Sequence, residues 1–214
     1  MVTLKHPLTF LVVISLATTT VKAQVSDTRL QKNYFVSNSS LYVNEASLNS
    51  EKSQLVGSGQ SFGIDYRRLI MNNEKLAIYA LIGIDDFRIG YSGWIDNNGV
   101  NENFSAKERY IVFNGGFIAS SKSRQNPLDF FDLEMAFAYW ILNNQSYFVN
   151  GTSVFPKAES RLSLMFYWHY SKVFDNVKFC IGPFVNIDLA EFNERGEPFG
   201  LALFGIKSGL GIGF

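Results

Sequence analysis

The sequence is poor in the residues from which redox and metal sites are built. It has 214 residues, among them one cysteine and two histidines. Cys180 therefore has no partner within the chain for a disulfide. One cysteine and two histidines also fall short of the ligand set of a zinc site. We expect no metal and no cofactor.

The sequence also has no excess of basic residues. Nineteen Lys and Arg are balanced by nineteen Asp and Glu, which gives a formal net charge of zero. Nucleic-acid binding proteins need a basic surface to contact phosphates. We therefore expect no nucleic-acid partner.

Long apolar runs are absent after the N-terminal region, and none reaches the ~18 residues of a membrane-spanning helix. The N-terminal region itself is typical of a secretory signal peptide. It has a weakly basic start at Lys5 and His6, the apolar run LTFLVVISLATTT over 8–20 and the exit VKA. We expect cleavage after Ala23, so that 1–23 is the signal peptide and 24–32 a short lead-in. The alternative is a buried N-terminal strand or helix.

Large apolar residues are abundant, and they alternate with small or polar ones. Aromatics make up 15% of the chain, with 20 Phe, yet the mean hydropathy is only +0.03. In FFDLEMAFAYWIL (130–142), every second residue from Phe131 to Ile141 is large and apolar. The other face carries Asp132, Glu134 and two alanines. This period of two predicts β-strands with two unlike faces.

Seven segments share this pattern, and their connectors alternate between short and long. The predicted strands are 56–70, 76–91, 109–121, 130–142, 161–174, 177–189 and 200–214. The short connectors are 72–75, 122–127 and 175–176, and the long ones are 92–108, 143–160 and 190–198. In an up-and-down sheet the two kinds of connector lie at opposite rims. Chain ends at the short-turn rim then require one more strand, which we place at 33–44. We expect bulges at Asp85–Asp86, where the apolar parity switches, and at Pro183.

The sizes of the two faces favour a membrane barrel over a soluble one. The polar face consists mostly of Gly, Ala, Ser and single charges, and it could not cover so many large apolar side chains. If lipid contacts the bulky face, the small polar face fills a narrow interior. The sequence thus predicts an all-β, antiparallel up-and-down transmembrane β-barrel of eight strands. A soluble periplasmic, lipocalin-like binding barrel is the alternative.

The chain over 33–214 resembles the small eight-stranded outer-membrane β-barrels of Gram-negative bacteria, of the OmpA/OmpX type. In these barrels the last strand ends in Phe, with apolar residues at alternate positions before it. Phe204, Ile206, Leu210, Ile212 and Phe214 match this pattern, whereas Ser208 departs from it. The resemblance implies location in the cell outer membrane, contact with its lipid and recognition of the last strand by the barrel-assembly machinery.

Eight charged residues fall on the face that points into the predicted barrel. They are Asp65, Arg67, Asp132, Glu134, Arg161, Lys178, Asp188 and Lys207. An eight-stranded barrel has room inside for little more than side chains, and unpaired charges there are costly. We therefore expect a cross-strand salt-bridge network that plugs the barrel. The alternative is a gate that opens to a thin ion path.

One catalytic pattern is present, in HYS at 169–171. His169 and Ser171 resemble the His-x-Ser motif of the lipid A deacylases, which are also outer-membrane barrels and use such a pair as base and nucleophile. The residues that follow, Lys172 and Val173, depart from that family, and Asp188 is the one acid considered as a partner. The other interpretation is that His169 is an interior hydrogen-bonding residue.

The long connectors contain acidic residues that could hold calcium weakly, but without the spacing of an EF-hand. They are Asp96, Glu102, Glu108, Glu191 and Glu194. The expected role is structural, surface-interacting or weakly conducting, with an extracellular ligand that the sequence does not identify. A lipid A-modifying acyl hydrolase is the alternative.

Overall fold

Eight long strands follow one another along the chain, and each pairs antiparallel with its neighbours. The computed structural model describes residues 31–47, 54–97, 99–122, 129–154, 160–189 and 200–214. The strands are β1 (Asn33–Ser47), β2 (Gln54–Asn72), β3 (Leu76–Asn97), β4 (Val100–Lys122), β5 (Asp129–Val149), β7 (Arg161–Phe174), β8 (Val177–Asp188) and β9 (Gly200–Gly213). Among the described residues, no helix is long and apolar enough to cross a membrane.

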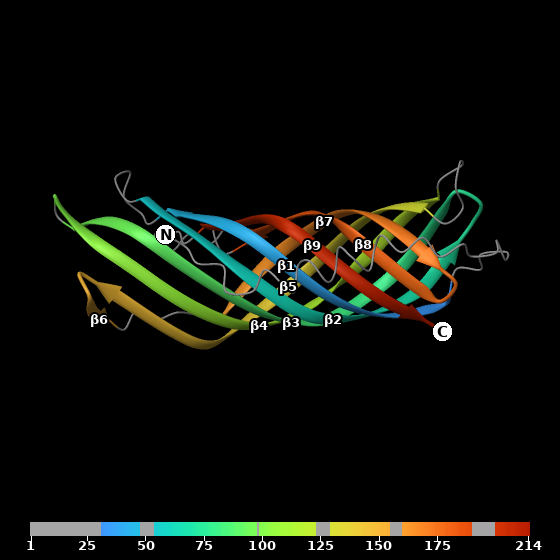
Figure 1. The fold of residues 1–214 in the computed structure, drawn as a ribbon, viewed down its shortest axis with the longest axis horizontal. Helices are drawn as coiled ribbons and strands as arrows, with labels where there is room; N and C mark the ends of the chain where they lie inside the picture. The colour runs from blue at the N-terminus through green and yellow to red at the C-terminus, as the bar shows by residue number, and fades with distance from the viewer. Residues whose placement is uncertain (1–30, 48–53, 98, 123–128, 155–159, 190–199) are drawn as a thin grey trace.

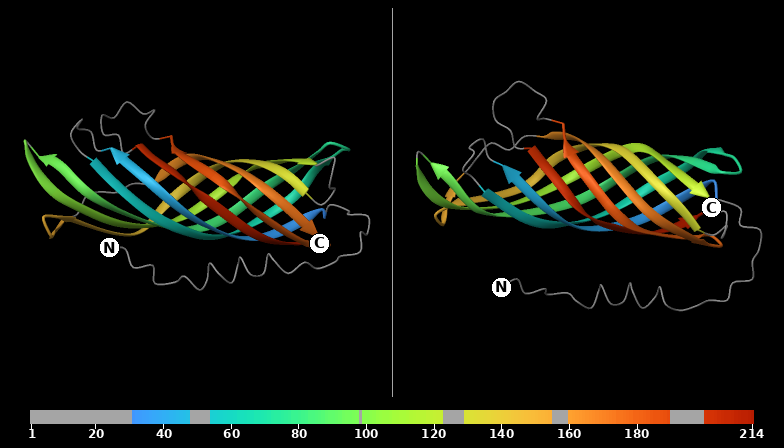
Figure 2. Two further views of the ribbon diagram at one scale, coloured as in Figure 1. Left: turned by 45° about the horizontal axis from the view of Figure 1, so that its top comes forward. Right: turned by 90° about the horizontal axis from the view of Figure 1, so that it is seen from above.

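The sheet closes into a ring because β1 pairs with β9 and β4 pairs with β5. Where the ring closes, the backbone N–H groups of Asn33 and Phe214 each donate to the other's carbonyl oxygen, at 3.3 and 3.0 Å. The tilted strands wrap around one axis (Figures 1 and 2). The predicted eight-stranded barrel is confirmed. A ninth strand, β6 (Thr152–Val154), pairs with β5 beyond the ring.

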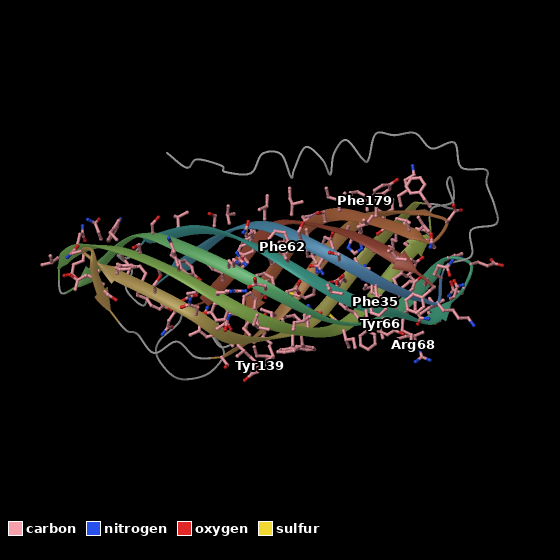
Figure 3. The ribbon with its side chains drawn as sticks, turned by 60° about the horizontal axis from the view of Figure 1, so that its bottom comes forward. Phe35, Phe62, Tyr66, Arg68, Tyr139 and Phe179 are labelled. Carbon is pink, nitrogen blue, oxygen red and sulfur yellow. The ribbon has the colours of Figure 1, made fainter. Side chains whose placement is uncertain are left out.

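Side chains alternate between the outside and the inside of the barrel, as the pleat of a strand requires. In β5, the outward-facing Phe131, Met135 and Phe137 are 66%, 44% and 58% exposed, whereas inward-facing Asp132, Glu134 and Trp140 are at most 3% exposed. Outward-facing aromatic side chains such as Phe179 and Tyr139 project from the wall (Figure 3). An apolar outside around a charged inside is the reverse of a soluble lipocalin-like cup and matches a membrane-spanning barrel.

Two connectors that the sequence predicts as long loops are extensions of the barrel wall. β3 and β4 stay paired as far as Asn97 and Val100, and β5 turns back into β6. At that turn Asn150 and Gly151 have φ of 49° and 79°, as in a type I′ hairpin. The loop prediction was wrong because Asn and Ser have low strand propensity, which cross-strand pairing overrides. Both hairpins reach away from the C-terminus in Figure 1.

The bulge expected at Asp85–Asp86 is absent, and that prediction was wrong. β3 pairs without a shift as Asp85 with Gly63, Asp86 with Phe62 and Phe87 with Ser61. The apolar residues of β3 change from outward-facing to inward-facing positions because the side chains inside the barrel change from polar to aromatic along its axis. Inward-facing Phe87, Ile89 and Tyr91 are 3%, 2% and 6% exposed. The strand keeps its register, and its interior contacts change.

The register of β8 also does not shift at Pro183, so the second bulge prediction was wrong. Ile181 pairs with Tyr170 and Phe184 with Tyr167, two pairs in one register. Gly182 allows this because β7 approaches it closely: a Cβ on Gly182 would lie 2.6 Å from Cα of His169. The described strands have their register shifts at Leu69/Met71 and at Arg109/Tyr110 instead.

The adjacent glycines Gly115 and Gly116 provide a test of this packing. A Cβ on Gly116 would overlap the carbonyl oxygen of Met135 and lie 2.6 Å from Cα of Ala136, whereas a Cβ on Gly115 would lie 3.8 Å from its nearest neighbour. We expect Gly116→Ala to lower the free energy of unfolding by roughly 1–3 kcal/mol and Gly115→Ala to change it by less than about 0.5 kcal/mol. Urea unfolding of the protein in detergent measures both values. Equal effects of the two substitutions would contradict the strand contact described here.

Candidate functional site

The barrel interior holds three groups of polar side chains, and the first surrounds the carboxylate of Asp132. Oδ2 of Asp132 lies 2.6 Å from Nζ of Lys178 and 2.8 Å from Nε2 of His169. Ser171 Oγ donates to the same oxygen over 2.7 Å. The four residues come from β5, β7 and β8, and none is more than 4% exposed. We call this group the Asp132 cluster.

The second group, the Glu134 cluster, combines two acids with two bases. Arg67 Nη2 lies 3.3 Å from Glu134 Oε2 and 3.2 Å from Asp65 Oδ2. Lys207 Nζ lies 3.4 Å from Glu134 Oε1 and 3.8 Å from Asp65 Oδ2. Because the four side chains come from β2, β5 and β9, the ion pairs join strands across the barrel. Opposite charges that alternate in this way compensate for their removal from water.

Asp85 and Asn114 lie beside the Glu134 cluster on β3 and β4. Asn114 Nδ2 donates to Asp85 Oδ2 over 2.6 Å. Glycines on neighbouring strands make room for these side chains: a Cβ on Gly83 would lie 2.5 Å from Asn114 Oδ1, and a Cβ on Gly63 would lie 2.5 Å from Asp85 Cγ. The small residues of the inner face therefore have a packing role, which is to leave space for charged neighbours.

The third group, the Glu108 cluster, lies where the β3–β4 hairpin rises from the barrel. The carboxylate of Glu108 accepts hydrogen bonds from the hydroxyls of Tyr91, Tyr110 and Tyr147. Arg161 Nη2 lies 3.4 Å from Glu108 Oε2 and donates to the Tyr110 hydroxyl over 2.6 Å. Glu108 is 5% exposed, so these contacts take the place of water around its charge.

Aromatic side chains fill the space between the Glu134 and Glu108 clusters. The ring of Phe87 lies 4.6 Å from that of Trp140 and 5.6 Å from that of Tyr42. Tyr42 also meets Phe184 edge to face, with ring centroids 6.1 Å apart. Trp140 Nε1 donates to Ser163 Oγ over 2.7 Å. This aromatic layer spans the barrel with rings from β1, β3, β5 and β8.

Two cavities border the clusters inside the described barrel, and both are small. One, beside Asp85, Phe87 and Lys207, has a volume of about 10 Å³, and a second, beside Trp140, Arg161 and Asp188, is of the same size. A single water needs at least ~10–15 Å³ by this measure. The described side chains therefore form a packed core.

The eight charged residues that the sequence assigned to the interior all face inward. Seven of them are at most 6% exposed, and the side chain of Arg161 is 13% exposed. Seven belong to the clusters described above, and Asp188 borders the second cavity beside Arg161. Sequence reasoning missed Glu108 and Asp85, which it assigned to a loop and a bulge. Continued alternation from Ile111 back to Lys107 and from Ile84 to Phe87 would have placed both inside.

The acidic residues considered for calcium do not form a cation site in the described part of the chain. Glu108 is occupied by tyrosine hydroxyls and Arg161. Asp96 and Glu102 belong to the β3–β4 hairpin, and Glu191 and Glu194 lie outside the described residues. Within the described ranges, no group of three or more His, Cys, Asp or Glu is placed to hold a metal ion.

His169 and Ser171 are neighbours on the inner face, but the Ser171 hydroxyl donates a hydrogen bond to Asp132 and not to His169. A serine nucleophile instead needs a base that accepts its proton. The carboxylate that contacts His169 is Asp132, whereas the sequence had suggested Asp188. Both His169 and Ser171 are at most 3% exposed. They hold the Asp132 carboxylate in place.

The residues predicted as an assembly signal all face outward. Phe204, Ile206, Leu210, Ile212 and Phe214 are 51–60% exposed. Ser208, the exception in the pattern, lies with its Oγ 3.4 Å from that of Ser39 on β1. Recognition by the assembly machinery stays a prediction, and the signal peptide lies outside the described residues.

The sequence matches no protein-family model and no curated protein. Its fold is similar to that of solved outer-membrane proteins. Neisserial surface protein A is 14% identical, with 85% of this chain and 97% of that one covered and a TM-score of 0.48. The outer-membrane protease OmpT from Escherichia coli is 13% identical, with 89% and 99% covered and a TM-score of 0.43.

Ail of Yersinia pestis, solved in complex with a heparin analogue, is 9% identical, with 85% and 99% covered and a TM-score of 0.38. The chain described here is an eight-stranded β-barrel of the membrane-spanning kind. The described structure supports that architecture without the comparisons, because its ring is closed, its outside is apolar and its inside is charged.

The Asp132 cluster yields a test of how buried charges support the barrel. Asp132→Ala would leave Lys178 without its carboxylate in a buried site, so we expect the free energy of unfolding to fall by roughly 3–5 kcal/mol. Glu74→Ala, at the exposed β2–β3 turn, is the control and should change it by less than about 0.5 kcal/mol. Urea unfolding followed by tryptophan fluorescence measures both. Matching unfolding midpoints for the two variants would show that the cluster does not stabilise the fold.

Proposed function

We propose that this protein is a closed outer-membrane barrel that displays the β3–β4 and β5–β6 hairpins at the cell surface as a platform for interaction. The observation that supports the proposal is the length of the wall beyond the apolar band. On β3 the unbroken series of outward-facing apolar residues ends at Ile84, and pairing with β4 continues to Asn97. At the rise of a strand, Asp86 to Asn97 is roughly 35 Å long.

The rigidity of this extension suits a surface for recognition better than a flexible loop would. Strand pairing fixes the hairpin backbone before any partner arrives, which lowers the entropy cost of binding. The Glu108 cluster anchors its base, since Tyr91, Tyr110 and Tyr147 come from β3, β4 and β5, three of the four strands of the extension. The hairpins combine Asn and Ser with charges of both signs, and this composition does not identify the ligand.

The packed interior supports a closed barrel over a conducting one. The Glu134 cluster and the aromatic layer of Phe87 and Trp140 occupy successive levels of the interior. An ion path would require both to move at once. The alternative of a lipid A acyl hydrolase is disfavoured by Ser171, because its hydroxyl is buried inside the barrel and donates to Asp132.

Peptide tags inserted at two turns test the proposal. A tag after Gly151, in the β5–β6 turn, should bind antibody on intact Gram-negative cells. A tag after Asn176, in the β7–β8 turn at the opposite rim, should bind antibody only after the outer membrane is permeabilised. Loop tips tolerate such insertions. Labelling of the Asn176 tag on intact cells, or of neither tag on permeabilised cells, would overturn the proposed display.

A further inference from the structure

A group of basic side chains lies on the outer face of β3 and β4, next to the apolar band on its hairpin side. Arg88 and Arg109 are opposite each other in the β3–β4 register, and Lys107 lies opposite Gly90 in the next outward-facing pair. The side chains of Arg88 and Arg109 are 52% and 44% exposed. We call these three residues the basic patch.

The two arginines are held side by side although like charges opposite each other destabilise a sheet. The carboxylate of Asp86 bridges them: Arg88 Nη2 lies 3.0 Å from Asp86 Oδ2, and Arg109 Nε lies 2.8 Å from Asp86 Oδ1. Arg88 Nε and Arg109 Nη2 make further hydrogen bonds to Oδ2, at 3.2 and 3.1 Å. Asp86 thus fixes the orientation of both guanidinium groups.

One carboxylate does not neutralise three bases. Asp86 is the acid that contacts the two arginines, and three bases with one acid give the patch a net charge of about two. Each guanidinium has five N–H groups, and two of its nitrogens contact Asp86. The remaining donors and Lys107 are directed toward the surroundings. A fixed pair of guanidiniums is well suited to bind phosphate oxygens through paired hydrogen bonds.

The position of the patch along the barrel indicates that the phosphate belongs to a lipid headgroup. The outward-facing pair below Arg88 and Arg109 is Asp86 with Ile111, and the pair below that is Ile84 with Phe113. Outward-facing pairs follow at about 7 Å along a strand, which is roughly 5 Å along the membrane normal at the tilt of such barrels. The guanidiniums therefore lie in the headgroup layer, which is about 5–7 Å deep on each side of the hydrocarbon.

The patch is also confined to one side of the barrel. In the described parts of β7, β8 and β9, the only outward-facing charge is Lys172, which lies near the β7–β8 turn at the opposite rim. A general attraction to anionic lipid would be served by basic residues around the whole rim. A single fixed cluster indicates one local contact with one headgroup.

We propose that Arg88, Arg109 and Lys107 form a binding site for the phosphate of a lipid headgroup in the leaflet at the hairpin end of the barrel. The apolar side chains below, among them Phe62, Ile84 and Phe113, contact the acyl chains of the same lipid. They are 54%, 45% and 48% exposed. The site requires the membrane-spanning fold and is independent of what the hairpins recognise.

Native mass spectrometry of the purified protein in neutral detergent tests this site. Lipid A, a diphosphorylated glycolipid, is the probe, and lipid A stripped of both phosphates and inorganic phosphate are the comparisons. We expect the wild-type protein to bind lipid A at least about tenfold more tightly than the stripped lipid. Inorganic phosphate at the same concentration should not displace it. Equal affinity for both lipids, or displacement by inorganic phosphate, would overturn the proposal.

A matched pair of variants locates the site on the barrel. Arg88→Gln/Arg109→Gln should lose the preference for lipid A, whereas Arg68→Gln/Lys172→Gln removes the same charge and should keep it. Arg68 is an exposed residue of β2 near the opposite rim (Figure 3). Folding of both variants is checked by their migration on gels before and after heating. Retained preference in the first variant, or an equal loss in both, would contradict the assignment.

Discussion

Closure of the sheet is the constraint on which the rest of this structure depends. In lipid, each backbone N–H and C=O group must find its partner within the protein. Here the pairing of β1 with β9 meets that requirement. It also divides the side chains of the described strands within the apolar band between an outside that contacts lipid and an inside that contacts other side chains. The alternation of the sequence is a consequence of that division.

The narrow interior of an eight-stranded ring then determines which residues can lie inside. Four strands contribute charges to the Asp132 and Glu134 clusters, and each charge is within reach of an opposite one from another strand. Gly83 leaves space for Asp65 of the Glu134 cluster, and Gly63 leaves space for Asp85 beside it. Toward the hairpins the filling becomes aromatic, and the Glu108 cluster joins the barrel to the extended wall. The residues that fill the barrel at its hairpin end therefore also support the extended wall that the proposed function uses.

The fold could be predicted from the sequence because strand parity is a local signal. The bounds of β7 were predicted as observed, and the charged residues were assigned to the correct face. Parity does not give the height of a residue or its partner across the barrel, so the contact of Asp132 with His169 could not be predicted. The hairpins were missed for another reason: their Asn-rich and Ser-rich segments form strands only because pairing compensates for low propensity. The bulge predictions failed for two reasons: the parity switch at Asp85–Asp86 reflects a change of the side chains that fill the barrel, and Pro183 does not shift the register of β8.

The orientation of two tryptophans tests the central claim, an outside in lipid and a packed inside, most directly. Trp168 faces outward and is 45% exposed, whereas Trp140 faces inward and is 2% exposed. Variants that keep one tryptophan each can be reconstituted in vesicles of phosphatidylcholine with brominated acyl chains, which quench fluorescence on contact. The account predicts strong quenching of Trp168 and little quenching of Trp140. Equal quenching of both, or quenching of Trp140 alone, would contradict it.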